Sequence, residues 1–122
     1  MKKTILIIED NEQNLYMMRF LLERHGFTVL AARDGKLGIE VASRQRPNCI
    51  LLDIQLPMMD GYDVARALRG DPELRDTPII VVTSYAMPGE RKKAIVASAT
   101  DYIEKPIDPD TFVEQISRHL SL

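Results

Sequence analysis

Short apolar runs alternate with longer amphipathic segments along the chain. Most of these runs hold four or five apolar or β-branched residues, too few for a helix and typical of strands that are covered on both faces. The pattern therefore predicts a sheet at the centre of the fold. The predicted strands are Thr4–Ile8, Thr28–Ala31, Cys49–Leu52, Ile79–Thr83 and the shorter pair Tyr102-Ile103.

The segments that separate or follow these runs carry apolar residues at helical spacing. The first, Asn14–His25, has its leucines and Met18 on one face, and Gly26 supplies a stop. The last begins at Asp108-Pro109, an N-cap residue followed by proline at the first helical position. The predicted helices between them are Gly35–Gln45, Tyr62–Leu68 and Glu90–Ala97.

Strand and helix alternate five times, which predicts right-handed crossover connections and a parallel sheet. The expected fold class is α/β: a five-stranded, doubly wound parallel sheet with helices on both faces, a three-layer sandwich. No internal repeat, low-complexity tract or linker divides the sequence. We therefore expect a single domain over residues 1–122, with a core of about residues 4–120.

The composition narrows the class of protein. Of the 122 residues, 28% are charged and 45% are hydrophobic, which suits a globular domain with a core. A formal net charge of −2 gives no basic surface for nucleic acid, and no apolar run is long enough for a membrane span or a signal peptide. The single cysteine, Cys49, excludes a disulfide framework and a cysteine-based zinc site. These features predict a cytoplasmic protein that binds neither nucleic acid nor membrane.

Polar residues stand where four of the predicted strands end: Glu9 and Asp10, then Asp53, Thr83 and Lys105. The carboxyl ends of parallel strands meet at one edge of the sheet, where ligands bind at the switch point in strand order. Three carboxylates that converge there repel one another unless a cation neutralises them. Oxygen ligands without imidazole or thiolate favour Mg²⁺ or Mn²⁺ over zinc. The sequence therefore predicts a divalent-cation site with an ammonium and a hydroxyl group beside it.

The stretches around these residues resemble the receiver domains of two-component response regulators, the family that includes the chemotaxis CheY-like proteins. They are ILIIEDN around Glu9 and Asp10, ILLDIQLPMMDG around Asp53, IIVVTSYA around Thr83, and DYIEKP. The resemblance covers about residues 4–120 and implies a flavodoxin-like fold. The phrases ILLDIQLP and VTSYAM are most similar to stand-alone, single-domain regulators of cell division (the DivK type) and to receivers attached to hybrid kinases.

The resemblance implies a role for each residue of the site. Asp53 would accept a phosphoryl group from a histidine phosphodonor and become an aspartyl phosphate. Asp10, Asp53 and the backbone carbonyl of Gln55 would hold Mg²⁺, with Glu9 acting through bound water, and Mn²⁺ is expected to substitute. Lys105 would neutralise a phosphoryl oxygen. This makes the protein a phosphoacceptor in a two-component system or phosphorelay.

The resemblance also implies how the signal leaves the site. The Thr83 hydroxyl would bond the phosphoryl group and move inward, and Tyr102 would rotate into the vacated space. The changed surface would be the face of the fourth helix, fifth strand and fifth helix, where a downstream protein would bind. We expect a monomer or weak dimer. The donor, a sensor histidine kinase or a histidine phosphotransfer protein, would dock near Asn14, Met17, Phe20 and Ile107.

A few positions depart from the family pattern or carry an expectation of their own. Glu9 replaces the commoner Asp, Ser84 stands where Ala is usual, and Ser98 stands where Gly usually precedes the fifth strand. Ser84 is small enough to leave room for the phosphoryl group. The side chains of Gln55 and Tyr85 would flank that group and slow its hydrolysis. The peptide bond before Pro106 is expected to be cis.

Two other classes of function fit the residues poorly. A Mg²⁺-dependent phosphohydrolase with Asp53 as nucleophile would need an Asp two residues later as general acid, and Gln55 stands there. A dinucleotide-binding domain needs a Gly-rich turn after the first strand, whereas EDNEQN is acidic. We therefore expect no enzymatic activity beyond self-phosphotransfer and autodephosphorylation.

Two questions remain open at the level of sequence. The start Met-Lys-Lys directly before the first strand favours a complete regulator without a DNA-binding output domain, the alternative being a receiver excised from a hybrid histidine kinase. Tyr16 and Phe20 lie off the apolar face of the first predicted helix, four residues apart. They form either a self-packed aromatic pair or a docking patch for the helices of the phosphodonor.

Overall fold

The five strands form one parallel sheet in the order β2-β1-β3-β4-β5. The computed structural model describes residues 3–84, 89, 92–94 and 99–120. Pairing begins with Thr4 opposite Thr28 on one side of β1 and with Ile5 opposite Cys49 on the other. The strands are β1 (Thr4–Ile8), β2 (Thr28–Ala32), β3 (Cys49–Asp53), β4 (Ile79–Thr83) and β5 (Asp101–Glu104).

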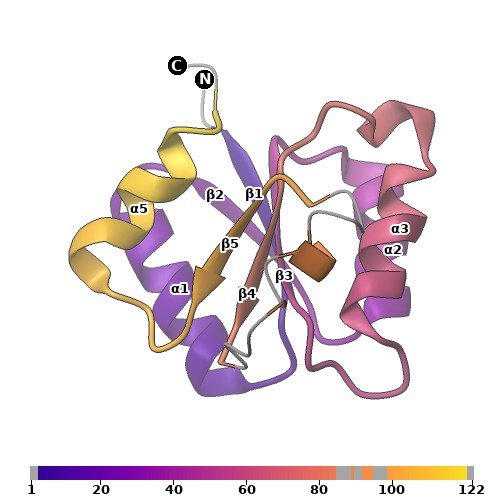
Figure 1. Cartoon of the computed structure of the whole chain (residues 1–122). Helices are drawn as coiled ribbons and strands as arrows, with labels where there is room; N and C mark the ends of the chain where they lie inside the picture. Colours follow the sequence, from indigo (N-terminus) through magenta and orange to yellow (C-terminus); the bar gives the residue numbers. More distant parts are fainter. Residues whose placement is uncertain (1–2, 85–88, 90–91, 95–98, 121–122) are drawn as a thin grey trace.

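Helices cover both faces of this sheet, with α1 and α5 on one face and α2 and α3 on the other (Figure 1). The predicted doubly wound α/β sandwich is therefore confirmed. Of the predicted fourth helix, only residues 92–94 are described, and these are helical. The remaining bounds are α1 (Glu12–Arg24), α2 (Gly35–Gln45), α3 (Gly61–Arg69), the short 3₁₀ helix η1 (Pro72–Leu74) and α5 (Pro109–Ser117).

An Asn or Asp side chain caps the first turn of α1, α2, α3, η1 and α5, the helices whose start and end are both described. Its oxygen accepts a hydrogen bond from a backbone N–H that the helix leaves without a partner. The Asp108 cap was predicted from Asp-Pro, and the same dipeptide at Asp71-Pro72 begins η1, which was not predicted. The capping residues are Asn11, Asp34, Asp60, Asp71 and Asp108.

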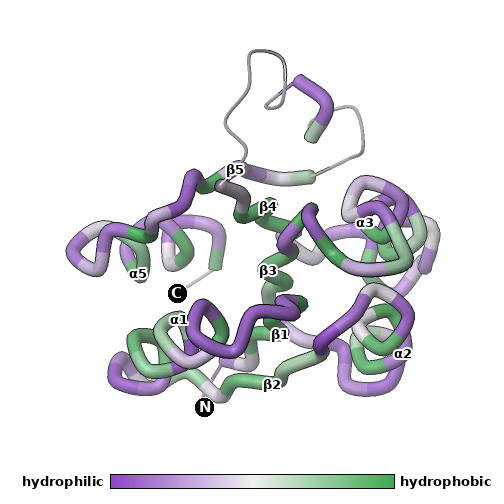
Figure 2. The backbone as a smooth tube through the Cα atoms, turned by 90° about the horizontal axis from the view of Figure 1, so that it is seen from below, coloured by the Kyte–Doolittle hydropathy of each residue, from purple (hydrophilic) through white to green (hydrophobic). Residues whose placement is uncertain are grey.

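Strand alternation divides the core into two layers. Ile5 and Ile7 of β1 pack with α1 and α5, whereas Leu6 and Ile8 point to the opposite face and pack with α2 and α3. Figure 2 shows the same division, with hydrophobic positions along the strands and on the sides of the helices that face them. Helices cover both faces of the sheet, which explains why the strands appear in the sequence as continuous apolar runs.

The close fit of α2 against β1 depends on one small residue. A Cβ atom added at Gly38 would lie 2.5 Å from Cδ1 of Ile8, so a side chain there would require Ile8 or the helix to shift. Ile8 directly precedes Glu9 and pairs with Leu52, the residue before Asp53. Helix α2 therefore packs closely against the end of β1 that precedes Glu9. Among the residues that the structure describes, no helix has the length and apolar character required to cross a membrane.

Candidate functional site

Three carboxylates meet where β1 and β3 end, at the switch point in strand order. One oxygen from each of Glu9, Asp10 and Asp53 lies within 4.8 Å of the others. Glu9 is 1% exposed and Asp53 is 4% exposed, whereas Asp10 is open to solvent. The predicted cluster is therefore present, with two acids buried at the sheet edge and the third at its mouth.

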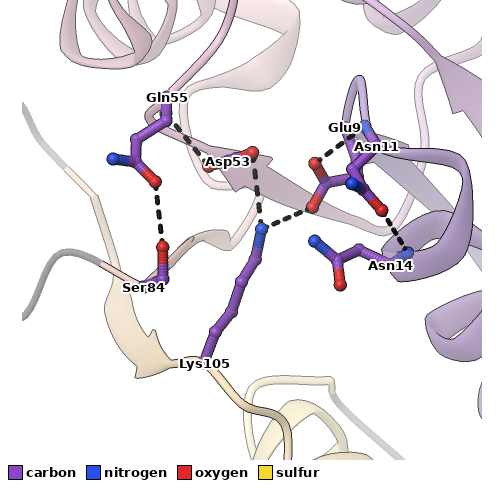
Figure 3. Close-up of polar contacts among 7 residues, drawn as sticks. All are labelled: Glu9, Asn11, Asn14, Asp53, Gln55, Ser84 and Lys105. Carbon is purple, nitrogen blue, oxygen red and sulfur yellow. Dashed lines mark hydrogen bonds and ion pairs between the residues drawn. The ribbon is translucent and has the colours of Figure 1, made fainter.

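Lys105 brings the opposite charge to this cluster from the segment after β5. Its Nζ lies 2.7 Å from Oε1 of Glu9 and 3.4 Å from Oδ2 of Asp53 (Figure 3). The backbone N–H of Lys105 donates to the Thr83 carbonyl at 2.8 Å, which holds the segment beside β4. The Lys105-Pro106 peptide bond is cis, as predicted. One ammonium group thus lies between two buried carboxylates.

The pKa of Glu9 reflects both its burial and its charged neighbours. Burial, and after it the neighbouring Asp53 carboxyl, raises the pKa of Glu9 to about 7, although Lys105 lowers it. The backbone N–H of Asn11 also donates to Oε2 of Glu9 at 3.2 Å. The ionised form of Glu9 is therefore disfavoured at this buried position, and a bound cation would favour it.

The donor atoms of the cluster suit a hard divalent cation. All three side chains offer carboxylate oxygens, and the ligand set contains neither imidazole nor thiolate. The backbone N–H of Gln55 donates to Oδ1 of Asp53 at 3.0 Å, so the main chain of Gln55 lies next to the carboxylates. These residues fit the Mg²⁺ site that the sequence predicted.

The two residues expected to transmit a signal lie on the neighbouring strands. Thr83 is fully buried at the end of β4 and pairs with Glu104 of β5. Tyr102 pairs with Val81, is 9% exposed, and packs in a small cluster with Val81 and Ala94. The structure thus places Tyr102 inside the fold, beside the described part of the fourth helix.

One polar contact at the rim of the site was not predicted. The Ser84 hydroxyl donates to Oε1 of Gln55 at 3.0 Å and joins the segments after β4 and β3 (Figure 3). The sequence held one signal for this contact, because Ser84 brings a hydroxyl group to a position where the family usually has alanine. Tyr85, which was expected to flank the same rim, and Ser98 lie outside the described residues.

The aromatic pair on α1 is exposed, as predicted. Tyr16 is 74% exposed and Phe20 is 42% exposed, and their rings stack with centroids 6.5 Å apart. The guanidinium of Arg24 lies 5.7 Å from the centroid of the Phe20 ring. The pair is therefore packed on itself and still open to solvent, so its role as a docking patch stays a prediction.

Known proteins are similar to this chain in sequence and in fold. The family model of the response regulator receiver domain matches residues 5–117. The polar-differentiation response regulator DivK of Brucella anthropi is 39% identical over 120 residues, which cover 98% of each chain. DivK of Brucella ovis is 38% identical over 120 residues, with the same coverage of each chain.

Solved structures agree with these relatives. The chemotaxis response regulator CheY4 of Vibrio cholerae gives a TM-score of 0.93 at 26% identity, covering 98% of this chain and 100% of that one. The receiver domain of the sensor histidine kinase PA1611 of Pseudomonas aeruginosa was solved with magnesium coordinated in its active-site cleft. It gives a TM-score of 0.89 at 33% identity and 97% coverage of each chain. Because the family model, the relatives and the fold agree over nearly the whole length, the chain belongs to the response regulator receiver domains of two-component signalling.

Proposed function

We propose that Asp53 is the residue that accepts the phosphoryl group in this receiver domain. The observation that carries the proposal is the position of Lys105, whose Nζ lies within 3.4 Å of Asp53 Oδ2 and 2.7 Å of Glu9 Oε1. An ammonium at this distance lets an anionic phosphoryl group approach a buried anionic carboxylate. Residues 4–120 act as one receiver unit in this proposal.

The transfer forms one bond and breaks one bond. An oxygen of Asp53 attacks the phosphorus of a phosphohistidine, and the P–N bond breaks with its electron pair left on the imidazole nitrogen, which then takes up a proton. The product is an acyl phosphate on Asp53. Enzymatic activity is confined to this self-phosphotransfer and to autodephosphorylation, because the amide of Gln55 cannot serve as a general acid toward other phosphate esters.

Asp10, Asp53 and the backbone carbonyl of Gln55 would hold Mg²⁺ or Mn²⁺, with Glu9 acting through bound water. The ion supplies charge neutralisation for the equatorial phosphoryl oxygens when it is bound. Support comes from the all-oxygen donor set and from the three carboxylate oxygens that lie within 4.8 Å of one another. The PA1611 receiver domain, with its magnesium ion in the active-site cleft, agrees with this assignment.

The proposed readout passes from Asp53 to the neighbouring strands. Thr83 would bond the phosphoryl group and Tyr102 would respond, which changes the face built by the fourth helix, β5 and α5 for a downstream protein. A sensor histidine kinase or histidine phosphotransfer protein would dock on another surface, near Asn14, Met17, Phe20 and Ile107. The protein would act as a monomer or weak dimer.

Acetyl phosphate provides a direct test of the acceptor residue. With Mg²⁺, intact-mass spectrometry should show one added phosphoryl group that is acid-stable and base-labile. Asp53→Asn should abolish the addition, and Asp63→Asn, a matched change on the exposed side of α3, should leave it unchanged. Equal labelling of Asp53→Asn and wild type would refute the assignment, and chelation of Mg²⁺ should suppress labelling.

A further inference from the structure

A hydrogen bond spans the rim of the Asp53 site and joins two loops. Ser84 is the first residue after β4, and Gln55 lies two residues after Asp53, the last residue of β3. The Ser84 hydroxyl donates to Oε1 of Gln55 at 3.0 Å, although both side chains are exposed. The bond therefore connects the ends of two neighbouring strands on the solvent side of the buried carboxylates.

The same glutamine also contacts Asp53 through its backbone. The Gln55 N–H donates to Oδ1 of Asp53 at 3.0 Å, while Lys105 lies 3.4 Å from Oδ2. In Figure 3, Gln55 and Ser84 lie on one side of Asp53, and Glu9 lies on the other, with Lys105 between the two carboxylates. Among the described residues, charged side chains therefore border Asp53 on one side, and the hydrogen-bonded side chains of Ser84 and Gln55 border it on the other.

A glutamine side chain at a protein surface has several rotatable bonds and samples many rotamers unless a contact holds it. Alanine, the usual family residue at position 84, has no hydroxyl to provide that contact. We propose that Ser84 is a positioning residue, which holds the Gln55 carboxamide at the rim and slows the access of water and small phosphodonors to Asp53. The proposal rests on the proposed function, because it assigns a rate-controlling contact to the same site.

The chemistry that the rim would slow is hydrolysis of the acyl phosphate. A water oxygen attacks the phosphorus, and the P–O bond to Asp53 breaks with its electron pair retained by the carboxylate. The proton of the water passes to solvent, and inorganic phosphate leaves. Asp53 is 4% exposed, so a small phosphodonor has a narrow approach to the carboxylate. A Gln55 side chain held at the rim would narrow this approach and the approach of water to the phosphoryl group.

The test compares Ser84→Ala with Ser84→Thr, which keeps the hydroxyl, and with Ser43→Ala, which removes an exposed hydroxyl from α2. Each protein is labelled with acetyl phosphate and Mg²⁺, the donor is removed, and the decay is followed by intact-mass spectrometry. Ser84→Ala should speed labelling and decay by about two- to tenfold, the factor that corresponds to one neutral hydrogen bond. Ser84→Thr and Ser43→Ala should keep the wild-type rates.

The double variant separates a positioning role from a general structural effect. If Ser84 acts through Gln55, then Ser84→Ala should cause no further acceleration in a Gln55→Ala background. Unchanged or slower rates in Ser84→Ala overturn the proposal, as do additive effects in the double variant or a Ser84→Thr variant as fast as Ser84→Ala. A wild-type protein that takes no label at Asp53 overturns the proposed function instead, so the two failures are distinct.

Discussion

At the scale of single residues, the site concentrates negative charge and offsets it with one lysine. Lys105 contacts both buried carboxylates, and Asp10 adds a third at the solvent edge. A cluster of this kind stores repulsion in the folded state, which binding of a cation relieves. Functional residues that cost stability in this way are expected where a protein must bind a multiply charged ligand.

Replacing Asp10 with Asn should make the metal-free protein more stable, by up to about 1 kcal/mol in free energy of unfolding, because one repelling charge is removed. Saturating Mg²⁺ should stabilise wild type and have less effect on Asp10→Asn, since a ligand stabilises only a state that binds it. Urea denaturation in chelator and in Mg²⁺ measures both effects, with Glu40→Gln on exposed α2 as the control. A less stable Asp10→Asn in chelator would contradict the repulsion.

The buried thiol of Cys49 should make stability depend on pH in the alkaline range. Burial raises the pKa of Cys49 from 9.0 to about 12, and the side chain is fully enclosed in the core. Its folded pKa is raised, so the contribution to stability is complete below the unfolded pKa and is lost as pH rises toward the folded pKa. Above about pH 9, wild type should lose up to roughly 1.4 kcal/mol per pH unit more than Cys49→Ala.

Denaturant melts of both proteins across this pH range provide the measurement, and the difference between them removes the contribution of other titrating groups. A thiol reagent at neutral pH should modify Cys49 only after unfolding, because the folded chain encloses it. Rapid modification of the native protein would show that the thiol is accessible.

At the scale of elements, the start of α3 is fixed by a glycine against the backbone. A Cβ atom at Gly61 would lie 2.2 Å from Cα of Ile54 and 3.0 Å from the carbonyl oxygen of Asp53. The backbone N–H of Gly61 donates to the Ile54 carbonyl at 3.2 Å. Because main-chain atoms cannot give way as a flexible side chain can, α3 reaches this close to the site only with glycine here.

Gly61→Ala should therefore destabilise the fold by about 2 kcal/mol or more, the cost of overpacking against rigid atoms. Gly70→Ala is the matched change at the other end of α3, where the nearest contact of an added Cβ is 3.5 Å. That variant should be neutral or more stable by up to about 1 kcal/mol, because alanine restricts the unfolded chain. Thermal and urea melts measure both, and equal stabilities of the two variants would refute the steric argument.

Arg69 at the end of α3 should stabilise the connection to β4. Its Nη1 donates to the carbonyls of Leu74, Arg75 and Thr77 at 2.8, 2.9 and 2.8 Å. Arg69→Met should cost about 2 kcal/mol, because partly buried carbonyls lose a donor. Arg66→Met removes only an exposed ion pair with Asp63 and should change stability by less than about 0.5 kcal/mol. Equal urea midpoints for the two variants would contradict this role.

At the scale of the whole molecule, β4 and β5 connect the site to the expected output face. Thr83 is buried at the end of β4, and the Tyr102 cluster lies between these strands and the described part of the fourth helix. A phosphoryl group that bonds Thr83 can shift the population of conformers only by its preference for the inward arrangement.

Beryllofluoride, a stable mimic of the phosphoryl group, should therefore change NMR chemical shifts at Tyr102 and residues 92–94 as well as around Asp53. Thr83→Ala should still bind beryllofluoride at Asp53 but show weaker shifts at Tyr102, because the hydroxyl that couples them is missing. Asp53→Asn is the control for specific binding. Shifts confined in wild type to the residues that touch Asp53 would mean that no signal leaves the site.

Local pattern alone determined most of the fold. The α2 bounds and the strands β1 and β4 follow from apolar periodicity and turn residues, and the alternation of strand and helix determined the parallel sheet. The start of α1 was placed too late, at Asn14 instead of Glu12, because the Asn11 cap was not identified. The η1 turn was missed although its Asp-Pro start follows the same rule as α5.

Tertiary structure decided how the site residues meet. The sequence indicated Glu9, Asp53 and Lys105, but only packing places the Lys105 ammonium closer to Glu9 than to Asp53, across 96 positions of chain. The hydrogen bond from Ser84 to Gln55 likewise depends on two loops that are 29 positions apart. Periodicity and capping are properties of neighbouring residues and can be read along the chain. The distance between side chains at different strand ends depends on how the strands pair across the sheet, and only the folded chain determines that pairing.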